Sequence, residues 1–502
     1  MSETIRKILV AGSGPVAWIA AAGLSRALRS RAVEVSIVAT EPDGAVAGHW
    51  TLPSQRGMHG LLGVNEPHFI HHTGSTFKLA TEHRGWQGEG SGYLHAHGEI
   101  GTEVEGTPYY KYLLSEALAG RPAAAENFSV AGAAARLAKF ARPMGEGLTA
   151  SFTYGFHIEE QAYTQYLRML AERLGVRVCP AAFAEVVLAE HGHISAVRLA
   201  DGTRADADLF IDCSGAAARL MQSVSSNERE DWSGWLPCDR IISAIGPASS
   251  APAPVTQTVA SQAGWLWHAP LADRSMAGFV YSSAFLNDDA ARATLAAFEP
   301  GLRGEPVLAR FSSGRRRDSW VRNCVALGSA AVELEPLAGA GLHLAQLGLA
   351  TLVELFPLNR SSSIEADEFN RVMGAHGDAL RDFTIAHYRV GRSLPNNLNS
   401  AFWRATRAAA PPANLAHKLD LFAASGRINL LDHETFEEID WAWLLIGGGC
   451  VPDAIELHTR EQLAKLKPQD VSAIRARVQQ VAASMPPHAE FVRRQAKPVA
   501  RT

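Results

Sequence analysis

The stretch IRKILVAGSGPVA, residues 5–17, sets a short apolar run before a glycine-rich turn and an alanine-rich segment. The run Ile5–Ala11 has the length and composition of a buried strand, and residues 16–28 carry the pattern of an apolar helix. A second strand is predicted at Glu34–Val38, which completes the spacing of a β-α-β unit. The stretch therefore predicts an α/β fold that begins with this unit.

The turn itself matches the pattern GxGxxG, with alanine at the third small position. Such a turn lets a pyrophosphate approach the backbone, where the following helix offers free N–H groups and the positive end of its dipole. The alternative is a tight turn with no ligand, but the strand–turn–helix context favours a dinucleotide. The residues predicted to bind the phosphates are Gly12, Ser13, Gly14, Pro15, Val16 and Ala17.

Further strand ends are predicted to converge on the same ligand. An acidic residue after the second strand commonly holds the adenosine ribose, and Glu41 stands two residues beyond the expected position. The strand and turn at Val325–Ala331 contain Ser329, and a later helix begins near Gly341 and Leu342. A helix N-terminus there could stabilise a reduced, anionic flavin. One nucleotide fingerprint with converging strand ends indicates an FAD protein.

Composition excludes several other classes. The 502 residues carry a formal net charge of −4, which gives no electrostatic reason to expect nucleic acid or an anionic membrane as a partner. No apolar run is long enough to cross a bilayer, and no signal-peptide pattern precedes the first strand. The five cysteines form no CxxC pair. We therefore expect a cytoplasmic protein without a membrane anchor.

The stretch GSTFKLA, residues 74–80, contains Lys78, the one lysine between Lys7 and Lys111. Taken alone, an ammonium group between apolar neighbours is read as a side chain that reaches back to solvent. Nearby histidines could suggest a metal site, but isolated histidines are more often hydrogen-bonded core or pocket residues, so we expect no metal. Trp265 and Trp267, two residues apart, fit two core aromatics on one face of a strand.

A set of longer motifs appears in order along the chain. These are TGSTFKLATEHRGW (73–86), GYLHAHGEIG (92–101), YGFHIE (154–159), DLFIDCSG (208–215), GWLWHAPL (264–271), GRRRDSWVRNCVALGSAAVELEPLAGAGL (314–342), FWR (402–404) and FEEIDWAWLL (436–445). With the N-terminal fingerprint, they resemble the flavin-dependent tryptophan halogenase family over nearly the whole length. The resemblance implies an FAD-binding Rossmann-like fold of the glutathione-reductase type with an inserted β-sheet substrate region. We predict a core over residues 1–395 and a mainly helical, substrate-covering part over residues 396–502.

The resemblance also implies a reaction and a set of roles. A separate flavin reductase supplies FADH2, which with O2 and chloride or bromide yields hypohalous acid. The acid travels through a tunnel to a lysine beside a small aromatic substrate, and a homodimer is compatible with the family. The positions that match are Lys78 as the catalytic lysine, Ala340 and Gly341 at the halide, Trp265 and Trp267 near the tunnel, His95 and His97 against the substrate, and Phe402 and Trp403 on the opposite wall.

Three positions depart from the family pattern. Ala338 stands where the family carries a glutamate, residues 46–49 read VAGH in a loop that usually reads GVGE, and Leu398 replaces a glutamate that grips free tryptophan. A methyl group can neither position an oxidant nor accept a proton. Three functions therefore stay open: a halogenase of an indole or other electron-rich aromatic, a related flavin monooxygenase or oxidase that no longer halogenates, and a non-catalytic binding protein.

Overall fold

The structure is a computed structural model that describes residues 4–41, 46–225, 229–357, 363–390, 400–463 and 465–495. Two compact units interleave along the chain. The first comprises Met1–Thr73, Ile158–Ile241 and Val307–Asp378, and the second comprises Gly74–His157, Ile242–Pro306 and Ala379–Thr502. The boundary expected at residue 395 lies outside the described residues, so the division there stays a prediction.

The first unit is built on a six-stranded sheet whose central strands are parallel. Strand β1 (Lys7–Ala11) pairs in parallel with both β2 (Glu34–Val38) and β12 (Leu209–Asp212). The full order is β20 (Trp320–Val321), β21 (Cys324–Ala326), β12, β1, β2 and β8 (Arg177–Val178). Ile8 and Val10 have no exposed surface, as expected for parallel strands covered on both faces. The predicted α/β fold is confirmed.

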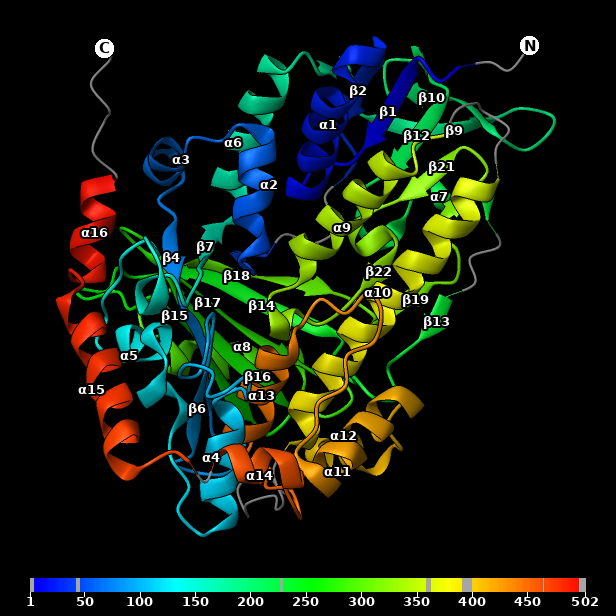
Figure 1. Cartoon of the computed structure of the whole chain (residues 1–502). Helices are drawn as coiled ribbons and strands as arrows, with labels where there is room; N and C mark the ends of the chain where they lie inside the picture. Colours follow the sequence, from blue (N-terminus) through cyan, green and yellow to red (C-terminus); the bar gives the residue numbers. More distant parts are fainter. Residues whose placement is uncertain are drawn as a thin grey trace. The chain divides into compact units, whose positions relative to one another are not determined.

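The fingerprint turn leads into α1 (Pro15–Ala27), which lies along the strands β1 and β2 in Figure 1. Its small residues let it pack closely against α6 (Glu160–Arg173) and α9 (Gly341–Glu354). The other elements of this unit are η1 (Arg29–Arg31), β3 (Gly48–Trp50), α2 (Ser54–Leu62), α3 (Glu66–Thr73), β9 (Phe183–Leu188), β10 (Ile194–Leu199), β11 (Arg204–Asp206), η4 (Gly215–Ala217), α7 (Met221–Val224), β13 (Arg229–Asp231), β19 (Gly314–Arg316), η5 (Gly328–Ala330), β22 (Val332–Glu333) and η6 (Pro336–Ala338).

The second unit is built on a seven-stranded sheet. Its order is β18 (Arg303–Arg310), β14 (Arg240–Gly246), β17 (Ser275–Tyr281), β16 (Gly264–Pro270), β15 (Val255–Ser261), β5 (Ala80–Arg84) and β6 (Gly92–Ala96). Strands β5 and β6 form an antiparallel hairpin, whereas β5 and β15 are parallel. Beside this sheet, β4 (Thr76–Lys78) pairs with β7 (Gly155–Glu159). The inserted β-sheet region that was expected is therefore present.

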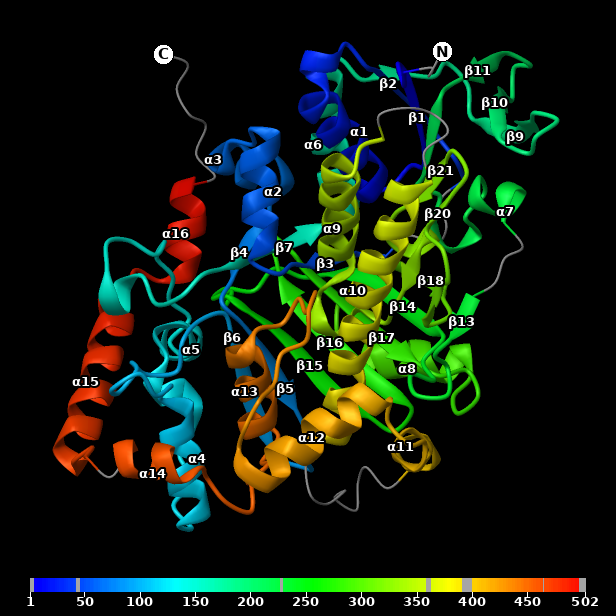
Figure 2. The same ribbon diagram turned by 45° about the vertical axis from the view of Figure 1, so that its right-hand side comes forward.

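Helices complete the second unit. Helix α10 (Ile364–Arg389) begins in the first unit and ends in the second, and the described residues between 400 and 495 form helices but no strand. Figure 2 shows α13 (Glu438–Gly447) beside β6. The helices are α4 (Tyr110–Leu118), η2 (Ala125–Phe128), α5 (Val130–Arg136), η3 (Gly147–Thr149), α8 (Asp288–Phe298), α11 (Ala401–Ala408), α12 (Ala413–Ser425), α13 (Glu438–Gly447), α14 (Leu457–Leu463), α15 (Pro468–Ser484) and α16 (His488–Gln495). No helix formed by the described residues is long and apolar enough to cross a membrane.

Candidate functional site

Lys78 ends strand β4 in the interior of the second unit. Its side chain is buried, with 1% of the residue exposed, so it does not reach back to solvent. Its Nζ lies 2.7 Å from Nε2 of His97. The backbone makes this contact possible, because the N–H of His97 donates to the carbonyl of Leu79 and extends the β5–β6 hairpin pairing. A buried amine and a buried imidazole are thus held together.

Burial changes the protonation of both groups. It lowers the pKa of Lys78 from 10.5 to about 7, against a smaller opposing attraction from Asp440. Burial and then the charge of Lys78 lower the pKa of His97 well below its usual value. A neutral His97 can accept a hydrogen bond from the ammonium of Lys78. The lysine can therefore exchange a proton near neutral pH, which an exposed lysine cannot do.

Two further histidines hold the strand that carries Lys78. Nδ1 of His157 lies 3.0 Å from Oγ1 of Thr76, and its Nε2 lies 3.0 Å from Oγ1 of Thr256. His488, on the last helix, accepts from the N–H of Phe77 through Nε2 at 3.3 Å and bonds the carbonyl of Pro252 through Nδ1 at 2.8 Å. Both histidines are completely buried. Sequence reasoning missed both histidines, because their hydrogen-bond partners lie far from them along the chain.

Helix α13 also contributes a side chain to this cluster. Nε2 of His95 donates to Oδ1 of Asp440 at 3.0 Å, and the Asp440 carboxylate also accepts from the N–H of Glu437 at 2.9 Å in a capping box. One turn later, Nε1 of Trp443 donates to the carbonyl of Gly98 at 2.9 Å. Helix α13 is thereby attached to the β6 end of the sheet. Asp440 lies within the motif at residues 436–445, but the motif by itself assigned it no role in the site.

The two aromatic pairs predicted for the site also belong to the second unit. Phe402 and Trp403 are fully buried, and Nε1 of Trp403 donates to the carbonyl of Ser261 at 2.8 Å. Trp403 packs edge-on against Trp86, with ring centroids 5.5 Å apart. Within the described chain, no ring contact or hydrogen bond joins this pair to His95 or His97. Its role as the opposite wall of a substrate site stays a prediction.

Trp265 and Trp267 lie on the same face of β16 and are fully buried. Gly278 on the neighbouring strand leaves room for Trp267, since a Cβ there would come within 2.4 Å of the indole nitrogen. This is the packing expected of core aromatics. Their role near a tunnel stays a prediction.

In the first unit, the glycine turn has the form that a pyrophosphate requires. A Cβ at Gly12 would lie 2.5 Å from the carbonyl oxygen of Cys213, so the turn can close only on glycine. At Gly14, by contrast, a Cβ would meet nothing within 4 Å. Helix α1 starts immediately after Gly14 without a side-chain cap. Open space in front of uncapped N–H groups fits the phosphates of FAD.

The remaining predicted cofactor residues also belong to this unit. Oε2 of Glu41 is exposed and lies 2.7 Å from Nη2 of Arg219. Asp212, which the sequence did not single out, is fully buried and accepts four hydrogen bonds, from the N–H and hydroxyl of Ser214 and from the N–H groups of Leu220 and Met221. It holds the turn after β12 and thus the loop that carries Arg219.

The segment from Ala338 to Leu342 leads into α9. Gly339 adopts φ of 68°, and a Cβ there would lie 2.6 Å from the carbonyl oxygen of Trp50. Ala340 caps α9 without a side-chain hydrogen bond, and a Cβ at Gly341 would meet nothing within 4 Å. This helix start therefore repeats the open, uncapped form of α1. Ser329 lies in η5, the turn after β21.

The other departures from the family pattern have different outcomes. The loop expected at residues 46–49 is in part strand β3, which contains His49, and Nε2 of His49 lies 3.2 Å from Oε2 of Glu160. Leu398 lies outside the described residues. The loop substitution thus has a local partner, whereas the expectation about Leu398 stays a prediction.

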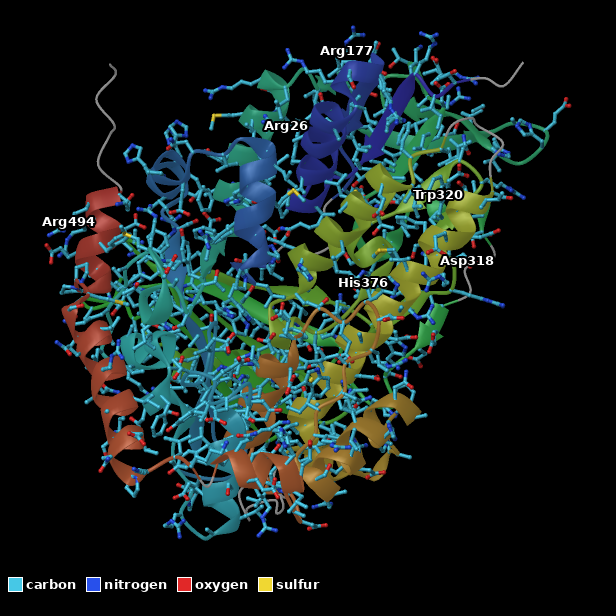
Figure 3. The ribbon with its side chains drawn as sticks, in the orientation of Figure 1. Arg26, Arg177, Asp318, Trp320, His376 and Arg494 are labelled. Carbon is cyan, nitrogen blue, oxygen red and sulfur yellow. The ribbon has the colours of Figure 1, made fainter. Side chains whose placement is uncertain are left out.

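Other polar regions are weaker candidates. A hollow of about 510 Å³ in the first unit includes Arg315 and Asp318, the latter labelled in Figure 3 with Trp320. Arg315 is already bonded to Glu230 and Asp378 at 2.8 and 3.0 Å, so its charge is compensated. Among the described residues, no group of three or more histidines, cysteines or carboxylates could hold a metal ion.

Comparisons with known proteins agree with this geometry. The family model described as tryptophan halogenase matches residues 7–462. Tryptophan 7-halogenase KtzQ of Kutzneria sp. (strain 744) is 31% identical over 448 residues, which cover 85% of this chain and 83% of that protein.

Two solved structures are similar over essentially their whole length. BrvH, a flavin-dependent halogenase from Brevundimonas sp. BAL3, is 31% identical with a TM-score of 0.91, and the match covers 98% of this chain and 99% of that chain. Xcc4156, a flavin-dependent halogenase from Xanthomonas campestris, is also 31% identical with a TM-score of 0.91. This match covers 100% of both chains. The protein is therefore a member of the tryptophan halogenase family of flavin-dependent enzymes.

Proposed function

We propose that the protein is a two-component halogenase of an indole or another electron-rich aromatic, with Lys78 as the catalytic residue. The observation that carries the proposal is the buried amine of Lys78, held 2.7 Å from His97 with a pKa lowered to about 7. An exposed lysine would be fully protonated and would have no means of keeping a reactive oxidant from water. This lysine is desolvated and fixed beside a second base.

Lys78 can act on hypohalous acid in two ways. As an ammonium, it donates a hydrogen bond to the oxygen of the acid and makes the halogen more electrophilic. As a free amine, it takes up the halogen and forms a haloamine. The free enzyme divides between the two forms near pH 7. Product formation should therefore rise through neutral pH if the amine acts, and fall if the ammonium acts.

Reduced FAD from a separate reductase would supply, with O2 and chloride or bromide, the oxidising equivalents for hypohalous acid. The residues Gly12–Ala17 would hold its phosphates at the start of α1, and the turn at Ser329 and the start of α9 at Leu342 would complete its site. The backbone N–H groups of Ala340 and Gly341 would bind halide, because backbone donors remain whatever the side chain is. Ala338 does not remove those donors.

The aromatic substrate is proposed to lie against His95 and His97, close to Lys78. Leu398 cannot grip an amino group as a carboxylate can. We therefore propose a substrate less polar than free tryptophan.

The test is a panel of indoles and phenols incubated with the enzyme, a flavin reductase, O2 and bromide, with products identified by mass spectrometry. Brominated product that disappears in Lys78→Met, while FAD still binds, supports the proposal. Oxygenated product that forms equally well without halide would instead identify a monooxygenase or oxidase. Halogenation that persists in Lys78→Met would contradict the role of the lysine.

A further inference from the structure

We propose that His95 accepts the proton that leaves the aromatic ring, and that Asp440 is the positioning residue that orients it. The inference rests on the proposed function and adds to it a base for the second half of the reaction. It starts from the hydrogen bond of 3.0 Å between Nε2 of His95 and Oδ1 of Asp440.

The chemistry requires such a base. The ring forms a bond to halogen taken from hypohalous acid, whose oxygen leaves as water with a proton from the ammonium of Lys78. The cationic ring then breaks the C–H bond at the same carbon, and that electron pair restores aromaticity. The released proton needs an acceptor within hydrogen-bond reach of the carbon. The amine that this leaves on Lys78 lies against His97, and His95 is a second base whose lone pair contacts no described group.

Four histidines belong to the cluster, three of them close enough to feel the charge of Lys78 and His95 beside His97, and their hydrogen bonds distinguish them. The lone pair of a neutral His97 faces Lys78. Both nitrogens of His157 are bonded to threonine hydroxyls. His83 is bonded through Nδ1 to Thr258 and stacks on a tyrosine, and burial lowers its pKa well below the usual value. Among these four, in the part of the chain that the structure describes, only His95 is bonded to a carboxylate.

The carboxylate also determines which nitrogen of His95 is basic. An ionised carboxylate can only accept hydrogen bonds, so Nε2 of His95 carries the hydrogen and Nδ1 carries the lone pair. In the described chain, Nδ1 has no hydrogen-bond partner, and Phe383 packs against the ring with centroids 6.0 Å apart. After proton transfer, Asp440 stabilises the imidazolium. Its bond to the N–H of Glu437 keeps the carboxylate in place at the start of α13.

The experiment compares single-turnover product formation from two forms of a substrate identified in the panel, one protonated and one deuterated at the reacting carbon. In the wild type, we expect the two forms to react at the same rate. In His95→Gln, whose amide can still donate to Asp440 but cannot accept the proton, product formation should slow roughly 100-fold. The protonated form should then react faster than the deuterated form.

Asp440→Asn should act in the same direction with a smaller effect, because an amide can reverse the tautomer of His95. Matched controls are His83→Asn, a buried histidine of the same hairpin, and Glu438→Gln on the same helix. In both controls, the two forms of the substrate should react at equal rates even if the overall rate changes. FAD binding and thermal unfolding of each variant show that the comparison is made on folded enzyme.

The outcomes distinguish the role of His95 as a base from the proposed halogenase function. A new isotope effect in His95→Gln and Asp440→Asn supports the base. If the wild type halogenates and both variants keep equal rates for the two forms, the inference is overturned while the proposed function stands. If the wild type halogenates no member of the panel, the proposed function fails and the inference fails with it.

Discussion

The glycine turn of the first unit and the Lys78 cluster of the second unit are built in opposite ways. The turn presents backbone N–H groups from consecutive residues, with Gly12 required by the approach of Cys213 and Gly14 left open. The cluster presents side chains from separate segments, with Lys78 at the end of β4, His97 directly after β6 and Asp440 on the C-terminal helix α13. A site made of backbone groups is thus determined by a few consecutive residues. A site made of side chains from distant segments forms only after the chain has folded.

We therefore expect the activity to depend on single side chains more strongly at the Lys78 cluster than at the glycine turn. Lys78→Met keeps the apolar volume and removes the amine, so we expect halogenation to fall by roughly 1,000-fold or more, as for loss of an activated nucleophile or electrostatic catalyst. Product yield by mass spectrometry measures the effect. Lys7→Met, at an exposed lysine of the first unit, is the control and should keep full activity. A similar loss of halogenation in both variants would show that Lys78 has no special role.

The same substitution should change stability in a pH-dependent way. Because the native pKa of Lys78 is about 7 and the unfolded value is near 10.5, the native state loses its proton first as pH rises between these values. Wild-type stability should therefore rise relative to Lys78→Met from pH 7 to 10.5 and stay level below pH 7. The full difference is roughly 5 kcal/mol, from about 1.4 kcal/mol per pKa unit. Denaturant unfolding of both proteins across this range provides the measurement, and parallel curves would show that Lys78 is not desolvated.

In the first unit, two glycine substitutions should separate folding from ligand binding. Gly12→Ala places a Cβ 2.5 Å from a carbonyl oxygen, and we expect it to cost about 3 kcal/mol of stability. Gly14→Ala meets no atom within 4 Å, so its melting temperature should be unchanged while its affinity for FAD decreases. Thermal unfolding without FAD and titration with FAD provide the two measurements. Unchanged affinity for FAD in Gly14→Ala would show that the open space at Gly14 is not a ligand site.

The smallest effect is expected at His488, which supports the cluster from a distance. His488→Gln retains one of its two hydrogen bonds at most, to Phe77 or Pro252, and should cost about 1 kcal/mol of stability. Because it holds the backbone next to Lys78, product yield should also decrease, while affinity for FAD should not. An unchanged product yield would show that β4 keeps its position without this histidine.

Much of the first unit could be predicted from local sequence. The strand Lys7–Ala11, the glycine turn and the helix Pro15–Ala27 were predicted within a few residues, because apolar periodicity and the demands of a tight turn act over short distances. The ordered motifs predicted the family, which the comparisons show. The interleaving of the units was not predicted, since contacts between distant segments leave no periodic pattern.

By itself, then, the sequence determined the α/β fold, the glycine turn and the family, and it singled out Lys78, His95 and His97 through motifs. Only the tertiary structure buried Lys78 and lowered its pKa, because desolvation requires a complete surrounding shell. Only the fold brought Asp440 to His95, 345 residues away along the chain. The identity of a side chain is local information, but its charge state and its partners are set by whatever segments fold around it.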